Sequence, residues 1–338
     1  MSHSYFQGRR GGALLDLPPM GIETLASPGD ENTDEATQAQ QEAIENDMKS
    51  TCLISAILPL STLDEDFAGH TVYLEKLKLM KQNYRGIRRL RRDGNCFYRA
   101  FGFAYLEYLL TGRHVKEAAR FKKKCDECKD TLIANGYTQF TVEDFHEQFV
   151  GMVDRFTVDG GTLEELEEVF NDQAYSDYYV VFLRLLVSAY IQKKAAYFVN
   201  FIDEGKTINQ FCETEVEPMA RESDNIHVAA LALAVELPIY VENCQQSGEL
   251  NRIEFPAHSD LMNMDDGDEQ QHVSDVTGGR CDGGCGGAGQ EASNDSCHCQ
   301  HPAVHQEKDH IIDYKTNPPV TLLYRPGHYD ILYPNSKK

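Results

Sequence analysis

Two long polar segments limit how much of this 338-residue chain can enter a folded core. Residues 1–48 and residues 247–316 are rich in Gly, Gln, Asp and Glu and poor in aromatic side chains. Such segments bury too little apolar surface to offset the entropy lost on ordering. We therefore expect a disordered acidic arm at 1–48 and one domain at 49–338, interrupted by a disordered Gly/Cys/His-rich insertion at about 247–316.

The charge of the chain is unevenly distributed. Of its 22 net negative charges, 16 lie in residues 1–50 and 247–310. The remaining residues are only mildly acidic, so they offer no net positive field that would displace counterions from a nucleic-acid backbone. No nucleic-acid partner is expected.

The sequence also argues against a membrane or secreted protein. Its longest strongly apolar run, Val180 to Ile191, contains Arg184 and falls short of the roughly 20 residues that a bilayer span needs. The N-terminal residues reach Asp16 and Pro18 before any signal-peptide core develops. Ten cysteines are too sparse for a disulfide scaffold. We expect no membrane partner, reduced thiols and a cytosolic or nuclear location.

The hydrophobic pattern predicts both helices and strands. Apolar residues recur at i, i+3, i+4 and i+7 in two long segments, which is typical of buried helix faces. A Pro-Gly turn within 325–328 joins two apolar segments near the C-terminus, which indicates a hairpin. These signals together predict a helix-rich α/β (α+β) domain. The expected elements are helices at 96–108, 178–189 and 226–235 and strands at 237–241, 320–324 and 329–333.

Asp93-Gly94-Asn95-Cys96 is a short polar turn that delivers a cysteine to the first turn of the first helix. The positive end of a helix dipole favours thiolate over thiol and lowers the pKa of a cysteine. The amides of this loop, freed by Gly94, are suited to holding an oxyanion. Cys96 is therefore a candidate nucleophile. A small buried hydrophobe at a helix start is an equally good interpretation of this segment alone.

A nucleophilic thiolate needs an imidazole that accepts and returns a proton, and an acceptor that fixes the imidazole tautomer. His328 and Asp330 lie two positions apart at the C-terminal strand, so both side chains fall on one face of it. His328 is therefore a candidate base for Cys96, with Asp330 holding the ring from behind.

Five sequence blocks, in this order along the chain, resemble the otubains, which are ovarian-tumour-domain cysteine deubiquitinases. Residues 93–103 are similar to the nucleophile segment of that family, and residues 324–333 are similar to its histidine hairpin. Between them, residues 170–173, 184–186 and 215–224 are also otubain-like. The resemblance implies the papain-like architecture of the ovarian-tumour domain, in which a small β-sheet packs between helical lobes.

The resemblance also assigns roles to individual residues. It implies that Cys96 is the nucleophile, His328 the general base and Asp330 the residue that orients the base. Asp93 takes the place of the catalytic-site aspartate in the oxyanion loop of the family. The implied oxyanion loop and substrate-binding residues are Asp93, Gly94, Asn95 and Cys96, and Glu222, Asp224 and His227, respectively.

The implied activity is that of a ubiquitin thioesterase, a cysteine-type hydrolase that cleaves isopeptide bonds between ubiquitin and lysine through a thioester. The preferred substrates would be polyubiquitin chains of the linkage that signals proteasomal degradation, and no cofactor is needed. Ubiquitin and polyubiquitin are the expected partners. An alternative is a non-catalytic regulator that binds and restrains a ubiquitin-conjugating enzyme. A papain-like protease of unrelated peptides is a third interpretation.

Some features differ from the family pattern, and others have ordinary structural explanations. Arg92 stands where the familiar otubains have proline, and the acidic insertion is unusual for them. The amphipathic stretch 72–80 is a candidate contact for a second ubiquitin or a conjugating enzyme, although packing is the commoner role of such a helix. The Cys/His-rich stretch 281–310 lacks the paired C-x2-C spacing of zinc sites, so no metal site is assigned. The basic run 85–92 is interpreted as solvated or acid-paired.

Overall fold

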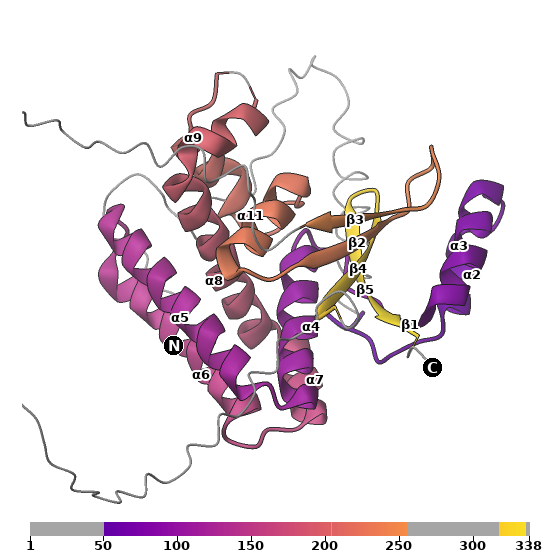
Figure 1. Ribbon diagram of the computed structural model, residues 1–338, viewed down its shortest axis with the longest axis horizontal. Helices are drawn as coiled ribbons and strands as arrows, with labels where there is room; N and C mark the ends of the chain where they lie inside the picture. Colours follow the sequence, from indigo (N-terminus) through magenta and orange to yellow (C-terminus); the bar gives the residue numbers. More distant parts are fainter. Residues whose placement is uncertain (1–50, 204, 256–317, 336–338) are drawn as a thin grey trace, which may run out of the picture. The chain divides into compact units, whose positions relative to one another are not determined.

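The computed structural model describes residues 51–203, 205–255 and 318–335 (Figure 1). The acidic arm at 1–48 and the insertion from residue 256 onward lie outside these described residues, as does the Cys/His-rich stretch at 281–310. Their expected disorder therefore stays a prediction.

A five-stranded sheet in the order β1-β5-β4-β2-β3 forms the centre of the described part. Neighbouring strands are antiparallel except for β2 and β4, which are parallel. The two C-terminal strands thus lie in the middle of the sheet, between β1 and β2. The strands are β1 (Tyr84–Arg88), β2 (Ile239–Asn243), β3 (Asn251–Phe255), β4 (Val320–Arg325) and β5 (His328–Pro334).

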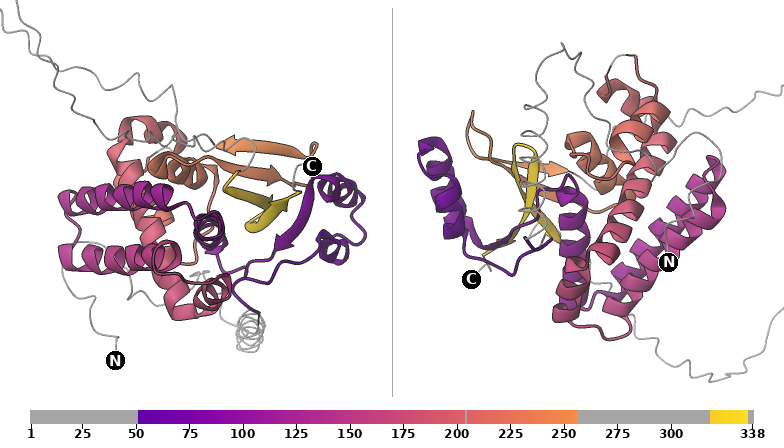
Figure 2. Two further views of the ribbon diagram at one scale, coloured as in Figure 1. Left: turned by 60° about the horizontal axis from the view of Figure 1, so that its bottom comes forward. Right: turned by 180° about the vertical axis from the view of Figure 1, so that it is seen from behind.

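Helices cover the sheet on both sides (Figures 1 and 2). A helical lobe containing α4 to α8 lies against one face, and α2 and α3 lie beyond the other. This arrangement confirms the expected fold class. The helices are α2 (Leu63–Asp66), α3 (Thr71–Asn83), α4 (Cys96–Gly112), α5 (Val115–Ala134), α6 (Gln139–Thr157), α7 (Leu163–Asn171), α8 (Gln173–Lys193), α9 (Ala195–Phe198), α10 (Ile208–Phe211) and α11 (Asn225–Val235), with 3-10 turns at Leu60–Thr62 and Val199–Phe201 and a π-helical turn at Cys212–Val216.

The turn between β4 and β5 is tighter than the sequence predicts. Arg325 pairs with His328, so only Pro326 and Gly327 lie between the strands. Gly327 has φ +69°, a left-handed conformation that glycine adopts at little cost. Because Arg325 stands directly opposite His328, its side chain lies beside those of the strand that carries the histidine.

The insertion begins later than expected. The composition predicts disorder for residues 251–255 as part of 247–316, but these residues form β3, which pairs with β2 in the register Ile239 to Phe255. Ile253 and Phe255 alternate with the exposed Arg252 and Glu254, a short strand pattern that the surrounding acidic residues obscure. The sheet therefore continues to residue 255.

Helix α4 is buried on nearly every side rather than on one face. Thirteen of its 17 residues are buried, because β4 and β5 pack on one side of it and α7 and α8 on the other. Helix α8 is similarly enclosed and carries the fully buried Arg184. Among the described residues, no helix is both long and apolar enough to cross a bilayer.

The central position of α4 predicts an unequal response to two phenylalanine truncations. Phe101 is fully buried in α4, whereas Phe140 in α6 is 70% exposed. Phe101→Ala should lower the free energy of unfolding by about 3–5 kcal/mol because it leaves a cavity. Phe140→Ala should change it by less than about 0.5 kcal/mol. Urea unfolding followed by circular dichroism measures both, and a loss below about 1 kcal/mol for Phe101→Ala would contradict the central role of α4.

Candidate active site

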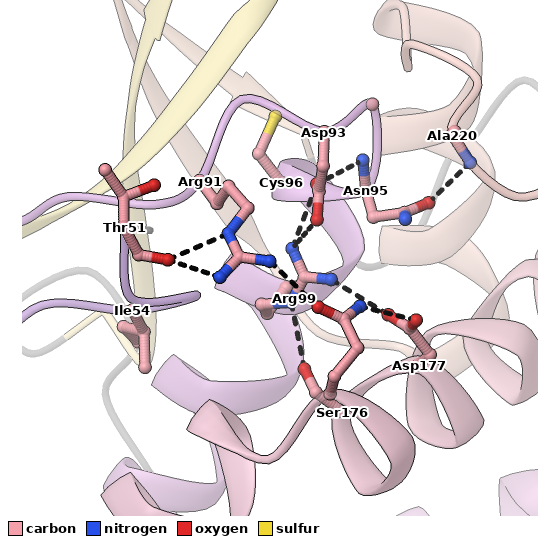
Figure 3. A network of polar contacts seen from close by, with 12 residues as sticks. Thr51, Ile54, Arg91, Asp93, Asn95, Cys96, Arg99, Ser176, Asp177 and Ala220 are labelled. Atoms are coloured by element: carbon pink, nitrogen blue, oxygen red, sulfur yellow. Dashed lines mark hydrogen bonds and ion pairs between the residues drawn. The ribbon is translucent and has the colours of Figure 1, made fainter. Parts of the chain in front are cut away.

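Cys96 is the first residue of α4 and is held there by a tight loop. Gly94 has φ +72°, and a Cβ on it would lie 2.3 Å from the carbonyl oxygen of Ala220. The side-chain oxygen of Asn95 accepts a hydrogen bond from the Ala220 amide at 2.9 Å (Figure 3). The nucleophile loop therefore lies directly on the segment around residue 220, and no side chain larger than hydrogen fits at position 94.

His328 and Asp330 lie side by side at the start of β5. His328 Nε2 and Asp330 Oδ1 are 2.9 Å apart, and both residues are buried. Asp330 also accepts hydrogen bonds from the Leu90 amide at 3.0 Å and from the Arg325 guanidinium at 2.6 Å. Burial acts to raise the pKa of Asp330, but hydrogen bonding to His328 and the charges of His328 and Arg325 outweigh it and lower the pKa to about 2. Asp330 is therefore ionised and suited to fixing the imidazole.

The structure brings Cys96 next to this pair. The backbone amide of Tyr329, the residue after His328, donates a hydrogen bond to Cys96 Sγ at 3.4 Å. His328 Nδ1 is buried and has no hydrogen-bond partner among the described residues. Nδ1 is thus the ring nitrogen that is free to accept the thiol proton. In this structure, Cys96 Sγ instead accepts its hydrogen bond from the backbone of β5.

Burial raises the pKa of the Cys96 thiol to about 11, despite the hydrogen bond from Tyr329. The charges of Asp93 and Asp330 act in the same direction as burial, and that of Arg99 opposes them. The position at a helix start is as the sequence predicts, but the expected net lowering of the pKa is wrong. Only 5% of the residue is exposed, so desolvation of the thiolate outweighs the helix dipole.

The Asp93 carboxylate holds the conformation of the nucleophile loop through hydrogen bonds. Its carboxylate accepts two hydrogen bonds from Arg99, at 2.8 and 3.0 Å, and one from the Asn95 amide at 2.9 Å (Figure 3). Arg99 is anchored in turn to Ser176 and Asp177 on α8. The Asn95 amide is therefore occupied, contrary to its expected role as an oxyanion donor.

The backbone amide of Cys96 is the better oxyanion donor. As the first residue of a helix, Cys96 has an amide without an intrahelical acceptor. No other acceptor for this amide lies among the described residues. A carbonyl oxygen placed next to Sγ would therefore find one unoccupied N–H group in the loop.

The expected substrate-binding residues line a cavity beside this site. The cavity has a volume of about 670 Å³ and is bordered by Tyr329, whose amide contacts Cys96. The Glu222 carboxylate lies against the Pro326-Gly327 turn, with its oxygens 3.0 and 3.1 Å from where a Cβ on Gly327 would lie. The described lining is acidic, with four carboxylates against one ammonium group. These are Asp203, Glu215, Glu222 and Asp224, and Lys206.

His227 borders the cavity, but its side chain is buried and bonds to the backbone at the start of α11. It is 3% exposed, and its Nδ1 accepts a hydrogen bond from the Asp224 amide at 3.0 Å. Burial and the nearby charge of Arg184 lower the pKa of His227 to about 4. The ring is therefore neutral at pH 7, and it fixes the start of α11, where Asp224 is the N-cap.

Sequence reasoning missed the arginines that hold the carboxylates of the site. Arg325 holds Asp330, and Arg99 holds Asp93. Both arginines lie within the otubain-like blocks 93–103 and 324–333, but spacing along the sequence does not show which acidic side chain an arginine pairs with. In the basic run before the loop, Arg88 pairs with Glu107 and Glu167, and Arg89 pairs with Asp66. The described residues contain no cluster of metal-ligating side chains.

Comparison with known proteins agrees with this geometry. Residues 46–334 match the sequence profile of the family described as Peptidase C65 Otubain. Ubiquitin thioesterase OTUB1 of Homo sapiens is 38% identical over 302 residues, covering 89% of this chain and 90% of that protein. The ovarian tumor domain-containing deubiquitinating enzyme 1 of Arabidopsis thaliana is 36% identical over 282 residues, covering 82% of this chain and 79% of that protein.

Solved structures give the same result. "The structure of h/ceOTUB1-ubiquitin aldehyde-UBCH5B~Ub" aligns with a TM-score of 0.65 and 26% identity, covering 90% of this chain and 98% of that one. "The structure of a ceOTUB1 ubiquitin aldehyde UBC13~Ub complex" aligns with a TM-score of 0.66 and 26% identity, covering 88% and 99%. The resemblance drawn from the five sequence blocks is thus confirmed. This chain belongs to the otubain family of peptidases.

Proposed function

We propose that this otubain is an active cysteine hydrolase that removes ubiquitin from lysine side chains. The proposal rests on one juxtaposition: Cys96 at the start of α4 contacts β5, which carries a buried His328 held by the ionised Asp330. A cysteine, an imidazole and a carboxylate that orients it are the parts that covalent acyl transfer needs. The relatives named as ubiquitin thioesterases supply the substrate class.

The reaction follows from the roles of these groups. His328 Nδ1 takes the proton from Cys96 Sγ, and the thiolate attacks the carbonyl carbon of the isopeptide bond. The resulting oxyanion accepts a hydrogen bond from the Cys96 amide. When the intermediate collapses, the C–N bond breaks and the imidazolium of His328 protonates the leaving lysine amine. Water, deprotonated by His328, then hydrolyses the thioester and restores the thiol.

The acidic cavity provides a reason for choosing ubiquitin. The C-terminal tail of ubiquitin is rich in arginine, and a tail that carries its last carbonyl to Cys96 must approach along a neighbouring surface. The carboxylates of Glu222 and Asp224 border such a surface beside Tyr329. Arginine and carboxylate groups form strong, directional pairs. We therefore assign substrate binding to Glu222 and Asp224, and assign His227 a supporting role through the Asp224 amide.

Two further properties are carried over from the family as part of this proposal. The preferred substrate is polyubiquitin of the linkage that signals proteasomal degradation. A second candidate function is restraint of a ubiquitin-conjugating enzyme without cleavage. Related solved structures hold ubiquitin aldehyde together with UBCH5B~Ub or UBC13~Ub, which favours this second function as an addition to hydrolysis.

A ubiquitin probe with a C-terminal thiol-reactive group tests the nucleophile directly. The wild-type protein should become covalently labelled. Cys96→Ser should remain unlabelled because it lacks the thiol, and His328→Ala should label at least about a hundredfold more slowly because no base accepts the proton. Gel electrophoresis measures the labelling, with Cys52→Ser, which removes an exposed thiol, as the control. Labelling of the Cys96→Ser variant would disprove the assignment.

Asp330→Asn should separate orientation of the base from binding. We expect kcat for ubiquitin hydrolysis to fall about a hundredfold or more, with KM little changed, because Asn neither fixes the same tautomer nor stabilises the imidazolium. Steady-state kinetics with a fluorogenic ubiquitin amide measures both constants. An unchanged kcat would contradict the role of Asp330.

The same variant tests the lowered pKa of Asp330. Since the folded-state pKa lies below the unfolded one, ionised Asp330 stabilises the fold above about pH 4, and this stabilisation is lost as the pH falls toward 2. Between pH 5 and pH 3, wild type should therefore lose about 1 kcal/mol more of its free energy of unfolding than Asp330→Asn does. Urea unfolding at both pH values measures the difference, and equal losses would contradict the shift.

The second candidate function requires a variant that spares the fold. Deleting α3 is unsuitable, because Leu77 and Met80 of this helix are in the core. Val72 and Leu79 are instead 41% and 50% exposed on α3. Val72→Glu/Leu79→Glu should abolish inhibition of a ubiquitin-conjugating enzyme in a chain-synthesis assay and leave hydrolysis within twofold of wild type. Cys96→Ala should abolish hydrolysis and leave the inhibition intact. Inhibition that survives the α3 substitutions would contradict the assignment of this surface to the conjugating enzyme.

A further inference from the structure

Arg184 is a fully buried cation without a carboxylate partner. It lies in the middle of α8 with no exposed surface. Its guanidinium donates hydrogen bonds only to neutral oxygens and lies over the Tyr98 ring, 4.5 Å from its centroid. The acceptors are the carbonyl oxygens of Gly94, Val216 and Arg221 and the side-chain oxygen of Asn95, at 2.8 to 2.9 Å. Among the described residues, no acidic side chain forms an ion pair with it.

These acceptors belong to two segments that meet at the active site. Gly94 and Asn95 form the oxyanion loop, and residues 216–221 form the segment on which that loop lies. One nitrogen, Nη2, bonds to both segments, so the guanidinium joins the oxyanion loop to the segment beneath it. The Ala220 amide bonds to the same Asn95 oxygen, which completes the junction (Figure 3).

The charge of Arg184 is placed to act on the reaction. A buried charge paired only with neutral dipoles keeps most of its field, because neither water nor a counterion screens it. Its guanidinium bonds to the two residues that directly precede Cys96. Burial lowers the pKa of Arg184, and the charges of Tyr98, Cys96 and Asp93 act to raise it. Asp93, the carboxylate of the loop, forms its ion pair with Arg99 rather than with Arg184.

We propose that Arg184 is a positioning residue whose guanidinium fixes the oxyanion loop and whose unneutralised charge stabilises the Cys96 thiolate and the developing oxyanion. The inference rests on the proposed role of Cys96 as nucleophile. It adds an electrostatic contribution to catalysis that comes from α8, outside the histidine hairpin and the nucleophile loop.

Two substitutions at Arg184 separate its charge from its geometry. The first readout is alkylation of Cys96 by iodoacetamide at pH 7 to 9 without ubiquitin, located by peptide mass spectrometry. Loss of the cation in Arg184→Gln should raise the pKa of the Cys96 thiol by about one unit. Because one unit removes about nine-tenths of the thiolate, alkylation should be about tenfold slower at each pH. Arg184→Lys keeps the charge and should alkylate within threefold of wild type. Its kcat for ubiquitin hydrolysis should nevertheless fall about tenfold, at constant KM, because an ammonium cannot hold both segments.

Arg88→Gln is the matched control. Arg88 is also buried and bonds near α4, but Glu107 and Glu167 neutralise its charge. This variant should lose stability and still alkylate at Cys96 within twofold of wild type. A tenfold slower alkylation in Arg88→Gln as well would attribute the effect to general loosening of the fold and overturn the proposal.

Asn95→Asp is the second variant and remains decisive if Arg184→Gln does not fold. It keeps an oxygen for Arg184 and for the Ala220 amide, so it adds a negative charge next to Arg184 without removing a hydrogen-bond acceptor. Under the proposal, the new carboxylate neutralises Arg184 and slows alkylation about tenfold. Alkylation at the wild-type rate in Asn95→Asp overturns the proposal. If wild-type protein does not cleave ubiquitin but alkylation still depends on Arg184, the proposed function fails and this inference stands.

Discussion

The fold depends on inserting the β4–β5 hairpin between β1 and β2. Strands β1 and β2 come from distant parts of the chain and do not pair with each other; β5 pairs with the first and β4 with the second. The same hairpin packs on α4, so it completes the sheet and the core together. It also carries His328 and Asp330 to Cys96. The pairing that closes the sheet is therefore the pairing that assembles the site, and the protein cannot have one without the other.

Buried arginines connect this assembly to its surroundings. Arg325, Arg99 and Arg184 each lie next to a different part of the site, and each is less than about a tenth exposed. Two of them pair with carboxylates and hold those carboxylates in place. The third meets only neutral oxygens. A buried charge costs much less when it is paired, so the unpaired Arg184 is the costly one, and its cost is best explained by its proximity to the reacting atoms.

The sequence predicts the fold class, the helices at α4, α8 and α11 and the C-terminal strands, because apolar periodicity and the Pro-Gly turn are local signals. It also identifies Cys96, His328 and Asp330 as a set. The pKa of Cys96 could not be predicted, since it depends on how completely the hairpin covers α4. Nor could the occupation of the Asn95 amide by Asp93, which depends on the conformation of one loop. Strand β3 was missed because two inward apolar residues are too few to be recognised within an acidic stretch.

In the absence of substrate, the site combines an ionised Asp330, a His328 Nδ1 without a hydrogen-bond partner among the described residues and a neutral Cys96 thiol. Because burial raises the pKa of this thiol to about 11, the neutral form prevails at pH 7. Under the proposed mechanism, the proton moves to His328 as the substrate carbonyl arrives, and Sγ then gives up its hydrogen bond from the Tyr329 amide. Reactivity is in this way coupled to occupancy of the site, since the charge separation that burial opposes is stabilised by the bound carbonyl and the surrounding cations.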